Sequence, residues 1–129
     1  MQLMPVTARA LAIEQGRPLV QLSDLHDPQR NVGLGSHYVG QLLRRFNGEA
    51  AVVAAAYNGG PTRIARWLKS ARPGHIDEWV EEIPLNETRN YVKDVLASAD
   101  VYRQLLEKSV IVASTEAKAS GTRNWAAGR

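Results

Sequence analysis

The residues best suited to chemistry in this sequence fall in two short segments. Tyr57 and Asn58 stand immediately before Gly59-Gly60-Pro61, and Glu87 and Tyr91 lie on either side of a basic residue further along. Tyrosine combines a flat apolar ring with a hydroxyl group, and asparagine has an amide that both donates and accepts hydrogen bonds. Because the glycines and the proline break the chain sharply, we expect the tip of Tyr57 to be accessible to a ligand.

Each of these residues also has a purely structural interpretation. Tyr57 can be a buried tyrosine at a helix end, and Asn58 can cap or shape the turn that follows. Glu87 stands in the first turn of a predicted helix, where the helix dipole favours a negative charge. Tyr91 lies one turn further on the same face, where it can reach a ligand or simply pack. The sequence leaves both interpretations open for all four residues.

Several other kinds of site are not expected. His26, His37 and His75 lie far apart, without the spacing of metal ligands. The chain has no cysteine, and no serine stands in a GxSxG context. The glycines do not follow a predicted strand, so no phosphate-binding loop is indicated. We therefore expect neither a metal nor a cofactor.

Composition places the chain among ordinary globular domains. It has 129 residues, of which 44% are hydrophobic, and a formal net charge of +3. This mild basic bias is compatible with an anionic polymer, but the charges alternate in sign, as on a solvated surface. A helical nucleic-acid or protein-interaction domain is an alternative supported by the charge alone; without an aromatic-rich basic stripe, we expect no nucleic-acid partner. Arg44, Arg45, Arg63 and Arg66 form the basic surface that could meet an anionic polymer or simply be solvated.

The elements that must position these residues are all helices. Apolar side chains recur at helical spacing, and proline or glycine punctuates the segments. Segment 49–57 is almost wholly apolar and is predicted to be a buried central helix, whereas 17–30 has the composition of a loop. We expect one domain over 1–108 and a polar, poorly ordered tail over 109–129. The predicted helices span 5–15, 31–46, 49–57, 61–71, 76–83 and 86–107.

Four segments together carry a resemblance to a known family. Met1-Gln2-Leu3-Met4-Pro5 is similar to the latter part of a GLMQ-x-MP motif, and residues 56–61 (AYNGGP) to an AYNxGP motif. Residues 83–92 (IPLNETRNYV) match IPxxETRxYV, and Asp27-Pro28 followed by Asn31 matches a DP-x-x-N segment. These segments occur in the family's order across residues 1–103. The chain thus resembles the soluble lytic murein transglycosylases.

The resemblance implies a fold and a chemistry. The family's fold is a goose-type lysozyme-like, all-α domain with a sugar-binding cleft. Its members cleave the bond between N-acetylmuramic acid and N-acetylglucosamine in peptidoglycan without adding water, which leaves 1,6-anhydro ends. A single glutamate with a raised pKa serves first as acid and then as base. Residue by residue, the resemblance assigns glycan binding to Gln2, Met4, Tyr57, Asn58, Glu87 and Tyr91.

The family's catalytic glutamate belongs to a Glu-Ser pair upstream of GLMQ. This sequence starts inside that motif, so we expect an N-terminally truncated domain in which no residue takes the acid role. Such a fragment, as a start at an internal methionine would give, is expected to be inactive alone and marginally stable. Glu87 receives only a positioning or peptide-stem role.

A non-catalytic peptidoglycan-binding module is the alternative. The resemblance implies a periplasmic or cell-envelope protein, with peptidoglycan glycan strands as its partner. The given chain has no signal-peptide pattern at its start and no apolar run of the roughly 18 residues that a membrane span needs. The sequence leaves oligomeric state, exo or endo cleavage, and stem-peptide preference open.

Overall fold

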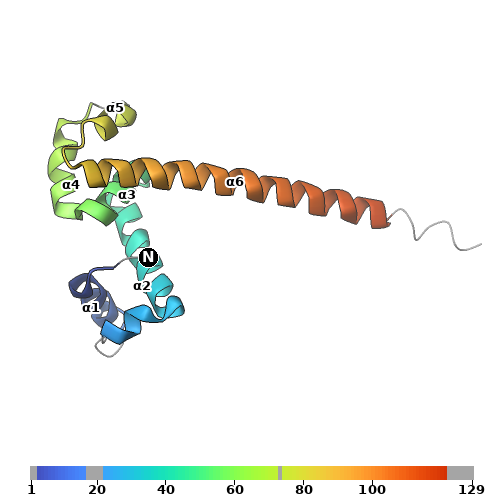
Figure 1. The fold of residues 1–129 in the computed structure, drawn as a ribbon, viewed down its shortest axis with the longest axis horizontal. Helices are drawn as coiled ribbons and strands as arrows, with labels where there is room; N and C mark the ends of the chain where they lie inside the picture. The colour runs from blue at the N-terminus through green and yellow to red at the C-terminus, as the bar shows by residue number, and fades with distance from the viewer. Residues whose placement is uncertain (1–2, 17–21, 73, 122–129) are drawn as a thin grey trace, which may run out of the picture. The chain divides into compact units, whose positions relative to one another are not determined.

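Every regular element in the described part of the chain is a helix (Figure 1). The computed structural model describes residues 3–16, 22–72 and 74–121. The chain divides into two compact units, residues 1–92 and residues 93–129. The helices are α1 (Pro5–Glu14), η1 (Leu22–His26), α2 (Pro28–Arg45), α3 (Ala50–Gly59), α4 (Pro61–Trp67), η2 (Leu68–Ser70), α5 (Ile76–Glu81) and α6 (Asn86–Gly121).

Proline marks the beginning of three of these helices. Pro5, Pro28 and Pro61 occupy the first turns of α1, α2 and α4, where a missing N–H has no intrahelical acceptor to lose. Asp27 caps α2, because its Oδ1 accepts a hydrogen bond from the backbone N–H of Gln29 at 2.9 Å. This cap starts α2 before residue 31, where the apolar pattern alone had placed the beginning of the helix.

The third helix is the centre of the first unit. Residues 51–56 of α3 are all buried, and the helix contacts both α2 and α4, as expected for an apolar central helix. The helix ends at Gly60, whose φ of +89° lies in the region that favours glycine. The larger buried side chains of this unit include Leu42, Phe46, Val52, Ile64, Trp79, Ile83 and Val92.

A second, smaller apolar cluster joins α1 to α2. Its buried members are Ala8, Leu11 and Ala12 on α1 and Leu34 on α2. Tyr38 is partly buried against this cluster. The first helix is therefore held on α2 by packing of small and branched apolar side chains, within the same unit as α3.

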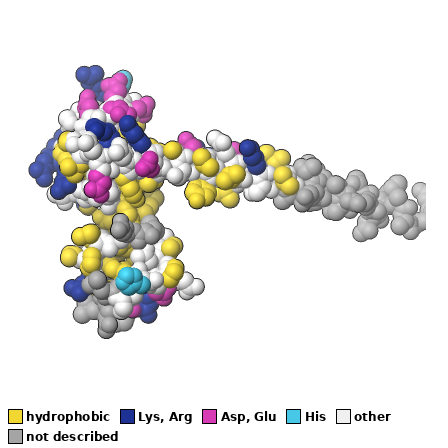
Figure 2. Space-filling model, in the orientation of Figure 1, with side chains coloured by type: hydrophobic (Ala, Val, Ile, Leu, Met, Phe, Trp, Pro, Cys, Tyr) yellow, Lys and Arg dark blue, Asp and Glu magenta, His cyan; other side chains and the backbone are white. Residues whose placement is uncertain are grey.

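The last helix is longer than the sequence predicted. The pattern indicated a helix over 86–107 followed by a polar tail, but α6 runs on to Gly121. Alanine, glutamate and lysine within 113–120 have good helix propensity, and no glycine or proline interrupts them before Gly121. Apolar side chains are exposed on α6, among them Val101, Leu105 and Val110 (Figure 2). The predicted tail residues 122–129 lie outside the described residues, and a domain boundary at 108 stays a prediction.

Truncating one core side chain should separate packing from surface effects. Ile64 is 0% exposed, so Ile64→Ala should lower the free energy of unfolding by about 2–5 kcal/mol. Ile13 is 62% exposed on α1, so Ile13→Ala should change it by less than about 0.5 kcal/mol. Urea unfolding followed by circular dichroism measures both; equal effects would contradict the assignment of the core.

Candidate functional site

The two sequence segments that suggested chemistry meet through one side-chain hydrogen bond. The Thr88 hydroxyl donates to Oδ1 of Asn58 at 2.7 Å, across 30 positions of sequence. Asn58 belongs to the last turn of α3, and Thr88 to the first turn of α6. Both lie in the first compact unit. We call residues 57–60 and 87–91 the α3–α6 junction.

Gly59 allows the two helices to come this close. A Cβ atom built on Gly59 would lie 3.1 Å from Thr88 Oγ1 and 3.2 Å from Thr88 Cγ2. It would also lie 3.4 Å from Cδ1 of Ile64, which is fully buried and cannot readily move aside. Glycine at this position therefore serves close approach of α3 to α6.

Tyr57 provides a hydroxyl group that lacks a partner. The predicted accessible tip is wrong, because its Oη is buried; it has no hydrogen-bond partner among the described residues. The pKa of Tyr57 is raised, first by burial and then by the neighbouring Tyr91 and Tyr38. The hydroxyl is thus neutral at physiological pH and can both donate and accept a hydrogen bond. A buried polar group without a partner costs free energy unless a ligand or water satisfies it.

Two further predicted residues stand on the first turns of α6. Tyr91 is half-buried one turn after Glu87, and it contributes to the raised pKa of Tyr57. Glu87 is exposed in the first turn. The structure therefore places Tyr57 and Asn58 at the end of α3 and Glu87 and Tyr91 in the first turns of α6, and the Asn58–Thr88 hydrogen bond joins these helix ends.

The arginine of the same motif has a structural role. Arg89 donates through Nη1 to the backbone carbonyls of Glu81, at 3.1 Å, and Ile83, at 3.3 Å. Its Nη2 also donates to Oδ1 of Asn86. These bonds fix the turn between α5 and α6, and they occupy the side-chain amide oxygen of Asn86.

The residues predicted near the start of the chain are not joined to the junction by any described contact. Met4 precedes α1 and is 72% exposed. Gln2 lies outside the described residues. Their assignment to glycan binding stays a prediction carried by the resemblance alone.

Tyr38 was not among the residues predicted for the site. Its ring centroid lies 5.6 Å from that of Tyr57, with the planes tilted by 47°. Burial raises the pKa of Tyr38, and the charge of Arg45 partly opposes this shift. Tyr38 lies four positions before the buried Leu42, and this helical spacing is the signal that would have placed it on the inner face of α2.

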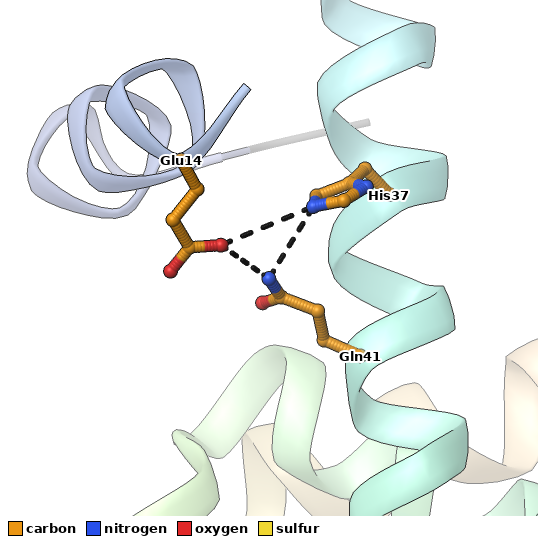
Figure 3. Close-up of polar contacts among 3 residues, drawn as sticks. All are labelled: Glu14, His37 and Gln41. Atoms are coloured by element: carbon orange, nitrogen blue, oxygen red, sulfur yellow. Dashed lines mark hydrogen bonds and ion pairs between the residues drawn. The ribbon is translucent and has the colours of Figure 1, made fainter. Parts of the chain in front are cut away.

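A polar cluster links α1 to α2 (Figure 3). Gln41 donates through Nε2 to Glu14 Oε2, and the same nitrogen lies 3.3 Å from His37 Nε2. His37 Nε2 and Glu14 Oε2 are 3.9 Å apart, and both side chains are partly exposed. Contacts of this kind contribute little stability. In the part of the chain that the structure describes, no three acidic or histidine side chains are grouped to hold a metal ion.

Comparison with known proteins identifies the family. The family model described as "Transglycosylase SLT domain" matches residues 1–80. The chain belongs to the transglycosylase SLT domain family. The resemblance inferred from the motifs is thereby confirmed.

Curated relatives of this SLT-family chain are much longer than it is. The soluble lytic murein transglycosylase of Escherichia coli K12 is 37% identical over 120 residues, which cover 90% of this chain but 18% of the relative. The corresponding protein of Salmonella typhimurium is 36% identical over 123 residues, with the same coverage. The membrane-bound lytic murein transglycosylase D of E. coli K12 is 27% identical over 121 residues, covering 89% of this chain and 25% of the relative.

A solved structure supports the fold. An inactive glutamate-to-glutamine mutant of the lytic transglycosylase Slt from Pseudomonas aeruginosa is 44% identical, with a TM-score of 0.76. The match covers 83% of this chain and 17% of that chain. The prediction of an all-α, lysozyme-like domain is confirmed. None of the helices within the described ranges is long and apolar enough to cross a membrane.

Removing the Tyr57 hydroxyl tests whether it is unpartnered. Tyr57→Phe should leave the free energy of unfolding unchanged or raise it by up to about 1 kcal/mol, because it removes a polar atom buried without a hydrogen bond. Tyr102 is 67% exposed on α6, so Tyr102→Phe is the matched control with no expected change. Thermal and urea unfolding measure both; a loss above about 1 kcal/mol in Tyr57→Phe alone would mean that the hydroxyl has a partner.

Proposed function

We propose that this chain is the glycan-binding part of a lytic transglycosylase domain that acts on bacterial peptidoglycan. One observation carries the proposal: the Asn58–Thr88 hydrogen bond joins the AYNGGP and IPLNETRNYV segments, which contain the unpartnered Tyr57 hydroxyl and Tyr91. Family membership and the names of the longer relatives support murein as the substrate class. The proposed location is accordingly the cell envelope, where that polymer lies.

The chemistry of the junction suits an amino sugar. A tyrosine ring offers an apolar face on which a sugar ring can stack, and its hydroxyl can bond a hydroxyl or acetamido group. Tyr57 and Tyr91 supply two such groups on the two helices that the Asn58–Thr88 hydrogen bond joins. Glu87 adds an exposed carboxylate that accepts hydrogen bonds from the sugar or attracts an amine of a stem peptide.

Within residues 1–129, we assign no residue to the role of catalytic acid. An acid that protonates a glycosidic oxygen at neutral pH needs apolar, partly dry surroundings. Glu87, the carboxylate of the junction, is exposed in the first turn of α6 and lacks such surroundings. We therefore infer that the chain alone binds glycan strands without cleaving them; a protein dedicated to binding, rather than cleavage, is the alternative that shares this site.

Binding to cell-wall sacculi tests the proposal directly. The chain should pellet with purified sacculi, and Tyr57→Ala should weaken this binding by about 10-fold, because it removes both a stacking ring and a hydrogen-bonding group. Tyr102→Ala, which removes an exposed ring from the second unit, should bind as the unchanged chain does.

Two outcomes would overturn parts of the proposal. Failure of the folded chain to pellet with sacculi would exclude the binding function. Release of 1,6-anhydromuropeptides, detected by mass spectrometry of the supernatant, would show that these residues contain a competent acid. In that event Glu87→Gln would be the first variant to assay, because Glu87 is the junction's carboxylate.

A further inference from the structure

Thr88 is a buried polar residue whose hydroxyl already has a hydrogen-bond partner within the chain. Its side chain is 1% exposed, and among the described residues it is the one polar residue classed as buried. Its hydroxyl donates to Asn58 Oδ1 at 2.7 Å, while its Oγ1 and Cγ2 atoms fill the space left by the missing side chain of Gly59. A hydroxyl with a satisfied hydrogen bond is tolerated in a core, and it restricts how its neighbours can move.

The Thr88 hydrogen bond joins the helix segments that carry the two tyrosines of the junction. Tyr57 directly precedes Asn58 in α3, and Tyr91 follows Thr88 by three positions in α6, on the same side of that helix. Fixing Asn58 to Thr88 therefore fixes the end of α3, with Tyr57, against the turn of α6 that holds Tyr91. The electrostatic effect of Tyr91 on Tyr57 is consistent with this proximity.

This arrangement gives Asn58 and Tyr57, which are neighbours in α3, different hydrogen-bonding roles. The Asn58 carbonyl oxygen already accepts the Thr88 hydroxyl, whereas the Tyr57 hydroxyl is buried without a partner among the described residues. An unsatisfied hydroxyl can bond a ligand only if it is held at the correct place, because misplacement of a binding group by about 1 Å is costly.

We propose that Thr88 is a positioning residue of the glycan site, acting through Asn58 to hold the Tyr57 hydroxyl where it meets the sugar. This inference rests on the proposed glycan binding and deepens it. It assigns Asn58 to the same positioning function, so that Asn58 supports the site and Tyr57 contacts the ligand.

A pair of matched variants tests the role of the hydroxyl. Thr88→Val keeps the branched shape and removes the donor, whereas Thr88→Ser keeps the donor and removes a methyl group. With a tetrasaccharide of alternating N-acetylglucosamine and N-acetylmuramic acid as the probe, calorimetry should show about 10-fold weaker binding for Thr88→Val. Thr88→Ser should bind within about 3-fold of the unchanged chain.

A double-mutant cycle tests whether Thr88 acts through Asn58. Asn58→Ala should weaken binding about as much as Thr88→Val, and the double variant should be no weaker than either single variant, because all three remove the same bond. Additive losses, or a Thr88→Ser variant as weak as Thr88→Val, would overturn the proposal. Unfolding curves of each variant show that binding is measured on folded protein.

A ligand-free measurement separates this inference from the proposed function. In protein with ¹³C-labelled tyrosine rings, Thr88→Val should lower the pKa of Tyr57 toward the ordinary tyrosine value, because a displaced ring is less buried. Tyr102 should titrate identically in both proteins. If the unchanged chain does not bind the tetrasaccharide, the proposed function fails; if the titration of Tyr57 does not change in Thr88→Val, the positioning role fails.

Discussion

The hydrogen bond from the Thr88 hydroxyl to the Asn58 carbonyl is the interaction on which the arrangement of the candidate site depends. It joins the last turn of a buried central helix to the first turn of the long helix, 30 positions later. The bond is geometrically demanding, because any side chain on Gly59 would press on Thr88. Its consequence is that the end of α3 that carries Tyr57 is tied to the first turns of α6, which carry Tyr91.

Gly60, Pro61 and Arg89 of the two motifs hold the helix ends around this bond. Gly60 ends α3 with a positive φ, and Pro61 starts α4 immediately afterwards. Arg89 holds the turn before α6 through the carbonyls of Glu81 and Ile83. These constraints explain in physical terms why AYNGGP and ETRNYV contain glycine, proline and arginine beside the tyrosines.

The helical elements could be predicted well because proline and glycine mark their ends. Two helix boundaries differed from the prediction because no apolar stripe marks them. The side-chain cap of Asp27 starts α2 at Pro28, and the helix propensity of a segment of small residues extends α6 to Gly121. The roles of the site residues were harder to predict from the sequence than the helices were. The role of Asn58 stayed open because its partner is distant in sequence, and Thr88 gave no signal because a buried threonine in a helix has no pattern of its own.

The most direct test of the account follows the tyrosine rings during glycan binding. In protein with ¹³C-labelled tyrosine, adding the N-acetylglucosamine–N-acetylmuramic acid tetrasaccharide should shift the resonances of Tyr57 and Tyr91 together, along one binding curve. Tyr102, exposed in the second unit, is an internal control that should not shift. Joint movement of the two junction tyrosines would support a single glycan site at the α3–α6 junction. A response of Tyr102 alone, or of neither junction tyrosine upon binding, would contradict it.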